Sequence, residues 1–94
     1  MTGSKKVNAL PPDVIGLQAL AHVVGDDELG QRFFALTGMD SAALRQRADE
    51  PAVLAAIIEF LGHHEADLIA CAAALGLAPD VLAQAGRHLA GDPA

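Results

Sequence analysis

Metal-ligating side chains gather in one short stretch of the sequence, which holds two histidines, two carboxylates and the only cysteine (His63, His64, Glu65, Asp67 and Cys71). On a helix, His64, Asp67 and Cys71 occupy positions i, i+3 and i+7, and therefore one side. Three such ligands could bind Zn²⁺ and leave one coordination position open. Natural sites usually take ligands from more than one element, however, and His22 and His88 are isolated. We therefore expect no metal and no other cofactor, and interpret the stretch as a polar helix start followed by a core cysteine.

The remaining acidic and nucleophilic side chains give little support for catalysis. Most carboxylates lie at predicted helix N-termini, where capping and the helix dipole favour them without any catalytic role. Glu59 is the exception because it lies within an apolar helix, where we expect it on a solvated strip or paired with an arginine. Cys71 lies on the apolar side of its helix, where a thiol is usually inert. We expect that the protein is not an enzyme and has no catalytic residues.

The charge of the chain disfavours nucleic acids and anionic membranes as partners. It contains 12 acidic and 6 basic residues, a formal net charge of −6, and two of the bases are Lys5 and Lys6. From Pro11 onward there are four bases and all twelve acids, which gives −8. Such a field repels phosphate backbones and anionic lipid headgroups.

One alternative, a DNA-binding helix-turn-helix, has the right spacing over residues 68–85. Small, turn and core residues fall where that motif needs them (Ala72, Gly76, Leu77 and Leu82). The second helix, however, would present Asp80 and Gln84 to the groove and no basic residue. Base edges and phosphates are mostly contacted by Arg, Lys and Asn, so we keep DNA binding only as a disfavoured alternative. A small metal-binding or catalytic protein is the other.

The elements that must position these residues are predicted to be helices only. Alanine and leucine dominate the composition, and no stretch alternates with a period of two. Prolines and acidic residues mark helix starts, and glycines mark helix ends. The sequence therefore predicts an all-α fold, a compact orthogonal bundle of five to six short helices.

Apolar residues at helical spacing predict which faces are buried. The helix that starts near Pro51 should be central, since Glu59 is its only charge before Gly62. Its inward set has i, i+3, i+4, i+7 spacing (Leu54, Ile57, Ile58 and Leu61). In the first two helices, we expect two other sets to face inward (Val14, Leu17, Ala21 and Val24, with Ile15, Leu20 and Val23 widening the stripe; Leu29, Phe33 and Leu36).

Phe33 and Phe34 provide the only candidate for a binding surface. Adjacent helical residues diverge by about 100°, so the two rings cannot share one contact. Phe34 lies over Gly30, where the missing side chain leaves room for a close neighbour; alternatively, Phe34 packs under the first helix. A hydrophobic fraction of 52% also leaves apolar area outside so small a core. We therefore expect a protein-interaction or regulatory domain that binds a protein partner, or a second copy as a homodimer, through Gly30 and Phe34.

The length of 94 residues indicates one domain. We place it at residues 11–91, after an N-terminal arm (1–10) expected to be disordered and before a short tail (92–94). One cysteine cannot form an internal disulfide, which is typical of a reducing compartment. No signal-peptide pattern is present, and no apolar stretch reaches the ~20 residues that a membrane span needs. We expect a cytoplasmic protein.

The sequence also resembles a known family, through motifs spread from Pro12 to Leu89. These are Leu17-Gln18-Ala19-Leu20, Phe33-Phe34-Ala35-Leu36-Thr37-Gly38, Pro51, Ile58-Glu59-Phe60-Leu61, Glu65 and Leu75-Gly76-Leu77. They are similar to an uncharacterised bacterial domain-of-unknown-function family of short all-helical proteins. His63-His64 departs from its pattern, in which acidic residues are common just before the glutamate. The resemblance implies a bacterial cytoplasmic protein and transfers no activity or ligand.

Overall fold

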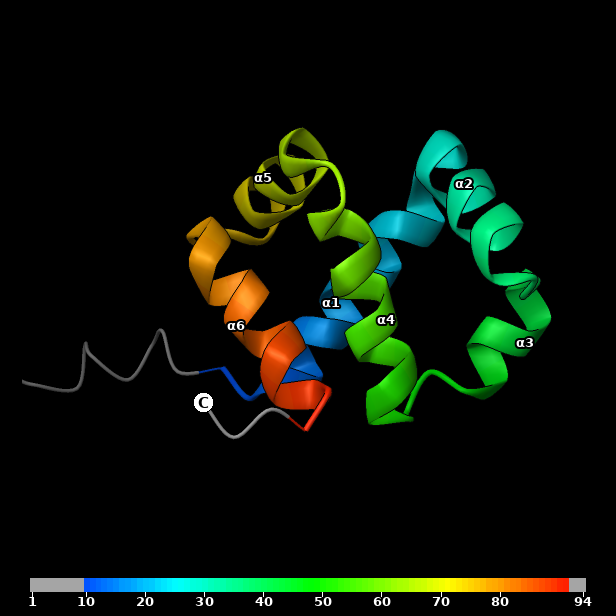
Figure 1. Ribbon diagram of the computed structural model, residues 1–94, viewed down its shortest axis with the longest axis horizontal. Helices are drawn as coiled ribbons and strands as arrows, with labels where there is room; N and C mark the ends of the chain where they lie inside the picture. Colours follow the sequence, from blue (N-terminus) through cyan, green and yellow to red (C-terminus); the bar gives the residue numbers. More distant parts are fainter. Residues whose placement is uncertain (1–9, 92–94) are drawn as a thin grey trace, which may run out of the picture.

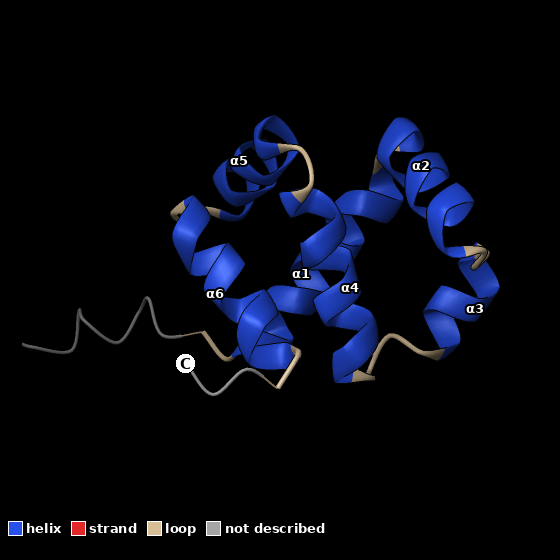
Figure 2. Cartoon of the chain, viewed as in Figure 1, coloured by secondary structure: helices blue, strands red, loops and turns tan. Residues whose placement is uncertain are grey.

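Six α-helices form the part of the chain that the computed structural model describes, residues 10–91 (Figures 1 and 2). They are α1 (Pro12–Gly25), α2 (Asp27–Thr37), α3 (Ser41–Gln46), α4 (Pro51–Gly62), α5 (Glu65–Leu75) and α6 (Pro79–Leu89). No strand occurs in this range, and the predicted all-α fold is confirmed. The predicted arm and tail lie outside the described residues, except for Leu10.

The helix boundaries follow from local chemistry that the sequence shows. The Asp26 side chain caps α2 by accepting a hydrogen bond from the Leu29 amide (3.0 Å), and Asp40 caps α3 in the same way. Gly38 and Gly76 end α2 and α5 in the left-handed conformation, with φ of 76° and 74°. Residues with a Cβ rarely adopt this conformation, so the two glycines fix where these helices stop.

Helix α4 forms the centre of the bundle. In Figure 1 it crosses in front of α1, with α5 and α6 on one side and α2 and α3 on the other. It packs most extensively against α6 and α1. Seven of its twelve residues are buried (Val53, Leu54, Ala55, Ile57, Ile58, Phe60 and Leu61). The prediction of a central fourth helix is therefore confirmed.

Glycines let α1 and α6 approach α4 closely. A Cβ added to Gly86 of α6 would lie 2.7 Å from Ile58 Cγ2, and one added to Gly16 of α1 would lie 2.9 Å from Leu54 Cβ. Real Cβ atoms do not make contacts this short. The α4–α6 and α1–α4 distances therefore depend on the absence of a side chain at these two positions.

The centre of the inward face predicted for α1 is wrong, whereas Ile15 and Val23, expected at its edge, do face the core. Ile15, Ala19 and Val23 are buried, whereas Leu17 and Val24 are 45% and 42% exposed. Because α1 is apolar around most of its circumference, the 3.6-residue period fits two different faces equally well. The face with the small residues Gly16 and Ala19 is turned inward because it permits close packing.

Leu36 is also exposed, at 67%, although it was expected beside Leu29 and Phe33 in the core. It lies in the last turn of α2. The left-handed Gly38 reverses the chain there, and Met39 packs against the core instead. Met39, which follows the glycine C-cap, thus makes the core contact that was expected from Leu36 in the final helical turn.

Candidate binding site

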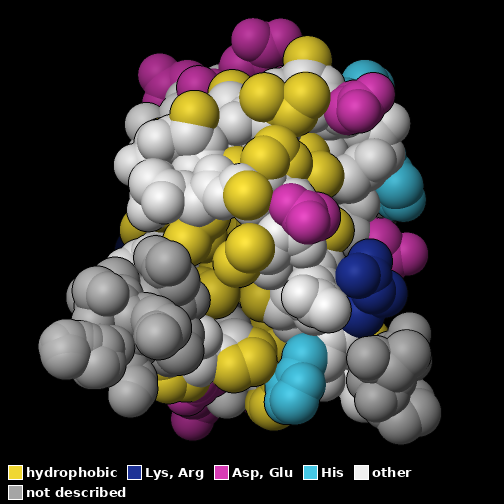
Figure 3. Space-filling view, turned by 90° about the vertical axis from the view of Figure 1, so that its left-hand side faces the viewer, with side chains coloured by type: hydrophobic (Ala, Val, Ile, Leu, Met, Phe, Trp, Pro, Cys, Tyr) yellow, Lys and Arg dark blue, Asp and Glu magenta, His cyan; other side chains and the backbone are white. Residues whose placement is uncertain are grey.

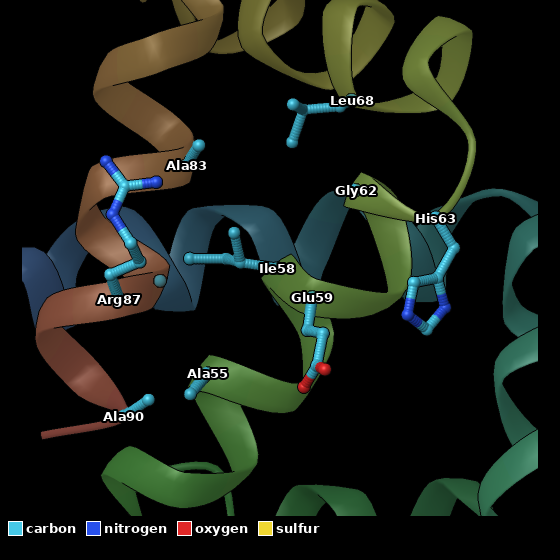
Figure 4. Close-up of a pocket in the computed structure, with 10 residues that line it drawn as sticks. Ala55, Ile58, Glu59, Gly62, His63, Leu68, Ala83, Arg87 and Ala90 are labelled. Carbon is cyan, nitrogen blue, oxygen red and sulfur yellow. The ribbon is translucent and has the colours of Figure 1, made fainter. Parts of the chain in front are cut away.

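A groove of about 440 Å³ lies between α4, α5 and α6, and we call it the α4–α6 groove (Figure 4). It is lined by Ala55, Ile58, Glu59, Gly62, His63, Leu68, Ala83, Gly86, Arg87 and Ala90. This volume falls within the range of ligand-binding pockets. None of these residues was predicted to form a binding site.

The dimensions of the groove follow from the residues on its two walls. On α4 the lining runs from Ala55 to Gly62, and on α6 from Ala83 to Ala90. Both intervals are i to i+7, or about two helical turns and ~10 Å. The walls consist largely of alanine and glycine, so that little side-chain volume fills the space between the helices. Ile58 forms the apolar floor, above which Leu68 of α5 extends (Figure 4).

Charged and polar side chains stand only at the rim. Glu59 and His63 come from α4 and its C-cap, whereas Arg87 comes from α6. All three are exposed. In Figure 4 the Arg87 guanidinium extends along α6 towards Ala83, while Glu59 and His63 point away from Ile58. The ion pairs within residues 10–91 involve other side chains, so Glu59 lies on a solvated strip, one of its two expected positions.

The surface over α5 and α6 is largely apolar. Figure 3 shows this side of the molecule, and hydrophobic side chains form a band down its middle. Carboxylates lie mostly at the margins of the band, and basic side chains lie at one edge. Contiguous apolar surface of this kind is typical of interaction sites.

The structure does not bring together the potential metal ligands of residues 63–71, a stretch that the sequence predicts to be a polar helix start and a core cysteine. Cys71 is fully buried in the core, where desolvation raises the pKa of its thiol from 9.0 to about 11. His64 is the exposed N-cap of α5, and Asp67 forms an ion pair with Arg32 (2.6 Å). Within residues 10–91, no group of three His, Cys, Asp or Glu side chains is placed to hold a metal ion.

Arg32 forms a link between α2 and α5 that sequence reasoning missed. Besides its ion pair with Asp67, its guanidinium lies 5.6 Å from the centre of the Phe60 ring. His22, which looked isolated in the sequence, lines the same cavity of about 330 Å³ as His64 and this ion pair. Arg32 and Asp67 are 35 residues apart, so no local spacing could have indicated the contact.

The structure places Gly30 and Phe34, the predicted partner-binding residues, against the chain's own helices. Gly30 is buried, and a Cβ there would lie 3.3 Å from the Val23 carbonyl oxygen of α1. Phe34 is half-buried and packs against the core, with its ring 6.2 Å from that of Phe33. Part of the room beside Gly30 is therefore occupied by α1. A partner role for the exposed part of Phe34 stays a prediction.

The α5–α6 pair has helix-turn-helix geometry, since the two helices bend by 99° across a short break. Its second helix carries the exposed residues Asp80 and Gln84 near its start, and its basic residues, Arg87 and His88, in its last turn. Among the described helices, none is by itself both long and apolar enough to cross a membrane; only α5 and α6 taken together are, and they are bent.

The structure defines a small all-α domain with a groove between α4, α5 and α6. The chain belongs to the family described as Protein of unknown function (DUF3572), which matches residues 11–92. The resemblance inferred from the motifs is thereby confirmed at the level of the family. No curated protein and no solved structure matches the chain.

Proposed function

We propose that the protein is a non-enzymatic interaction domain that binds a short amphipathic helix of a partner protein in the α4–α6 groove. The shape of the groove carries this proposal: the apolar floor at Ile58 lies between two walls that are each about two helical turns long and rich in alanine and glycine. Amphipathic helices bind grooves through large apolar residues at i, i+3 or i+4. Such residues lie about 5–6 Å apart, so a groove of ~10 Å accommodates two of them.

The rim favours a partner of defined charge. Glu59 and Arg87 stand on opposite walls and are both exposed. A bound helix with a basic residue towards α4 and an acidic residue towards α6 would complement both. Rim charges of this kind set orientation and association rate more than affinity.

The positions of the polar groups support binding rather than catalysis. Glu59 and His63 are the candidates for proton transfer among the lining residues, and both are exposed and point away from the floor. Catalytic acids and bases must converge on the bound substrate. The net charge of −8 beyond Pro11 and the acidic start of α6 argue against DNA as the partner. The fully buried, lone Cys71 agrees with a reducing compartment, and we include a bacterial cytoplasm in the proposal.

A displayed library of amphipathic helical peptides, with leucine fixed at positions i and i+4, tests this function. Peptides selected on the wild-type protein are titrated against Ala83→Arg, which fills the groove. We expect about a tenfold or greater loss of affinity, as for an interface anchor. Ala35→Arg, an equally drastic change on the exposed face of α2, should bind like wild type. Arg87→Glu should reduce affinity mainly for peptides with an acidic residue on the α6 side.

Amide chemical shifts of the labelled protein locate the bound peptide independently. Changes centred on α4 and α6 support the proposal. Selected peptides that bind Ala83→Arg as tightly as wild type, or whose shift changes lie away from these helices, would refute it.

A further inference from the structure

The exposed side of α1 carries an apolar stripe that the domain itself does not cover. Val14, Leu17, Ala21 and Val24 follow one another at intervals of 3, 4 and 3 residues, which is the spacing of a helix-pairing seam, and Leu10 precedes the helix. Leu10, Leu17 and Val24 are 38%, 45% and 42% exposed, and they make up three of the five large hydrophobic side chains exposed among the described residues. The opposite side of α1 is buried against the core, so the stripe is held rigidly outward.

A hollow lies directly beside this stripe. It has a volume of about 510 Å³ and is lined by Gln18, Ala21 and His22 of α1 and by Ala74 and Leu75 of α5. Leu17 lies one helical turn before Ala21 and therefore on the same side of α1. The same face thus offers both a protruding aliphatic side chain and a recess lined largely by small and aliphatic residues. We call the stripe and the hollow together the α1–α5 face.

From these features we infer that the α1–α5 face pairs with the same face of a second copy of the chain. A two-fold symmetric interface requires a surface that is complementary to itself. Leu17 of one copy can enter the hollow of the other, and the reverse contact forms by symmetry. This pairing is independent of partner binding in the α4–α6 groove, which involves other residues.

The charge distribution supports a second copy as the occupant. Each chain carries a net charge of −6, so two copies repel one another over most of their surfaces. Residues 14–25 of α1 and 68–75 of α5 contain no Asp, Glu, Lys or Arg. Two copies that meet through these segments therefore bring none of these charged side chains from them into the interface. A membrane fits poorly, because interfacial helices usually carry Lys or Arg along their polar side.

The size of the face predicts a weak, reversible dimer. The stripe from Val14 to Val24 is ~15 Å long, which limits the interface to the low end of specific complexes, below ~1,200 Å² in total. We expect a dissociation constant on the order of 10–100 μM.

Sedimentation velocity of the full chain from low micromolar to several hundred micromolar tests the pairing. The wild type should shift from monomer to dimer, whereas Leu17→Glu should raise the dissociation constant at least about tenfold. Leu36→Glu is the matched control, since Leu36 is 67% exposed on α2 and lies outside the face. It should dimerise like wild type.

Ala74→Glu, which alters the hollow rather than the stripe, provides a second variant if Leu17→Glu does not fold by circular dichroism. It should weaken the dimer in the same way. A wild-type chain that stays monomeric throughout, or a dimer that Leu17→Glu and Ala74→Glu leave intact, would overturn the inference. Neither result depends on the peptide titrations, so this pairing and groove binding can fail separately.

Discussion

The contact between Gly86 and Ile58 gives the sharpest test of the fold, because it fixes how closely α6 approaches α4. In Gly86→Ala the new methyl carbon would lie 2.7 Å from Ile58 Cγ2 and 3.0 Å from Ile58 Cβ. Ordinary carbon–carbon contacts are about 3.5–4.0 Å. Ile58 Cβ is attached to the α4 backbone and cannot swing aside, so the helices must move apart.

The expected magnitude is the difference between two opposing effects. Alanine in a helix interior is favoured over glycine by up to ~1 kcal/mol, whereas overpacking a core costs about 1–3 kcal/mol. With the full propensity gain, we therefore expect Gly86→Ala to lower the free energy of unfolding by up to about 2 kcal/mol. Gly25→Ala is the control, since nothing lies within 4 Å of its added Cβ and its φ is not left-handed. That change should stay within about 0.5 kcal/mol of wild type.

A double-mutant cycle identifies the clash as the cause. Ile58 is 3% exposed, and Ile58→Ala alone should cost about 2–4 kcal/mol. It also removes the Cγ2 atom, which makes the shortest contact, but keeps Cβ at 3.0 Å. Gly86→Ala should therefore cost less in that background than in wild type, with a coupling of about 1 kcal/mol. Urea unfolding with unchanged m-values measures all four proteins. Strictly additive losses, or a Gly86→Ala protein more stable than wild type, would refute the assigned packing.

Three further perturbations test other parts of the structure. Because burial raises the pKa of Cys71 from 9.0 to about 11, the unfolded chain loses this proton first as the pH rises. The free energy of unfolding should fall between these pH values by up to about 2–3 kcal/mol relative to the pH profile of Cys71→Ala; identical profiles would contradict this. Asp67→Asn should lower the free energy of unfolding by only about 0.5–1 kcal/mol in urea melts, because the ion pair with Arg32 is about one third exposed. A loss above ~3 kcal/mol would show that this ion pair stabilises the fold far more than an exposed pair does. Phe34→Ala should cost about 1–3 kcal/mol without altering dimerisation; unchanged stability with weakened association would instead favour Phe34 as a partner anchor.

Most of the helical framework could be predicted because local chemistry decides it. Asp26 and Asp40 cap helices through their own side chains, and Gly38 and Gly76 stop helices by their conformation. The central position of α4 could also be predicted, because a helix with one charged residue in twelve has almost no side suited to solvent. The orientation of α1 could not be predicted from the sequence, because the spacing of its apolar residues fits two faces. Only tertiary packing against α4 selects one of them.

The candidate site could not be predicted, for a related reason. Alanine and glycine on α4 and α6 carry no chemical signal, and they form a groove only because residues 55–62 and 83–90 are brought side by side. Sequence reasoning instead weighed residue types that can do chemistry, such as His64 and Cys71, assigned them structural roles, and predicted a surface at Gly30 and Phe34. The structure separates His64 and Cys71, one exposed at a helix start and one in the core.

The unexpected orientation of α1 connects the two proposed surfaces. Because Gly16 and Ala19 face the core, Leu17 and Val24 point outward, where they can pair with another copy. The α4–α6 groove involves no residue of α1, so dimerisation would leave both grooves open. A dimer with two grooves binds a partner carrying two helical segments more tightly than a single groove does, since the second contact forms at high effective concentration. Self-association and groove binding, each of modest affinity alone, would then together give tight binding of such a partner.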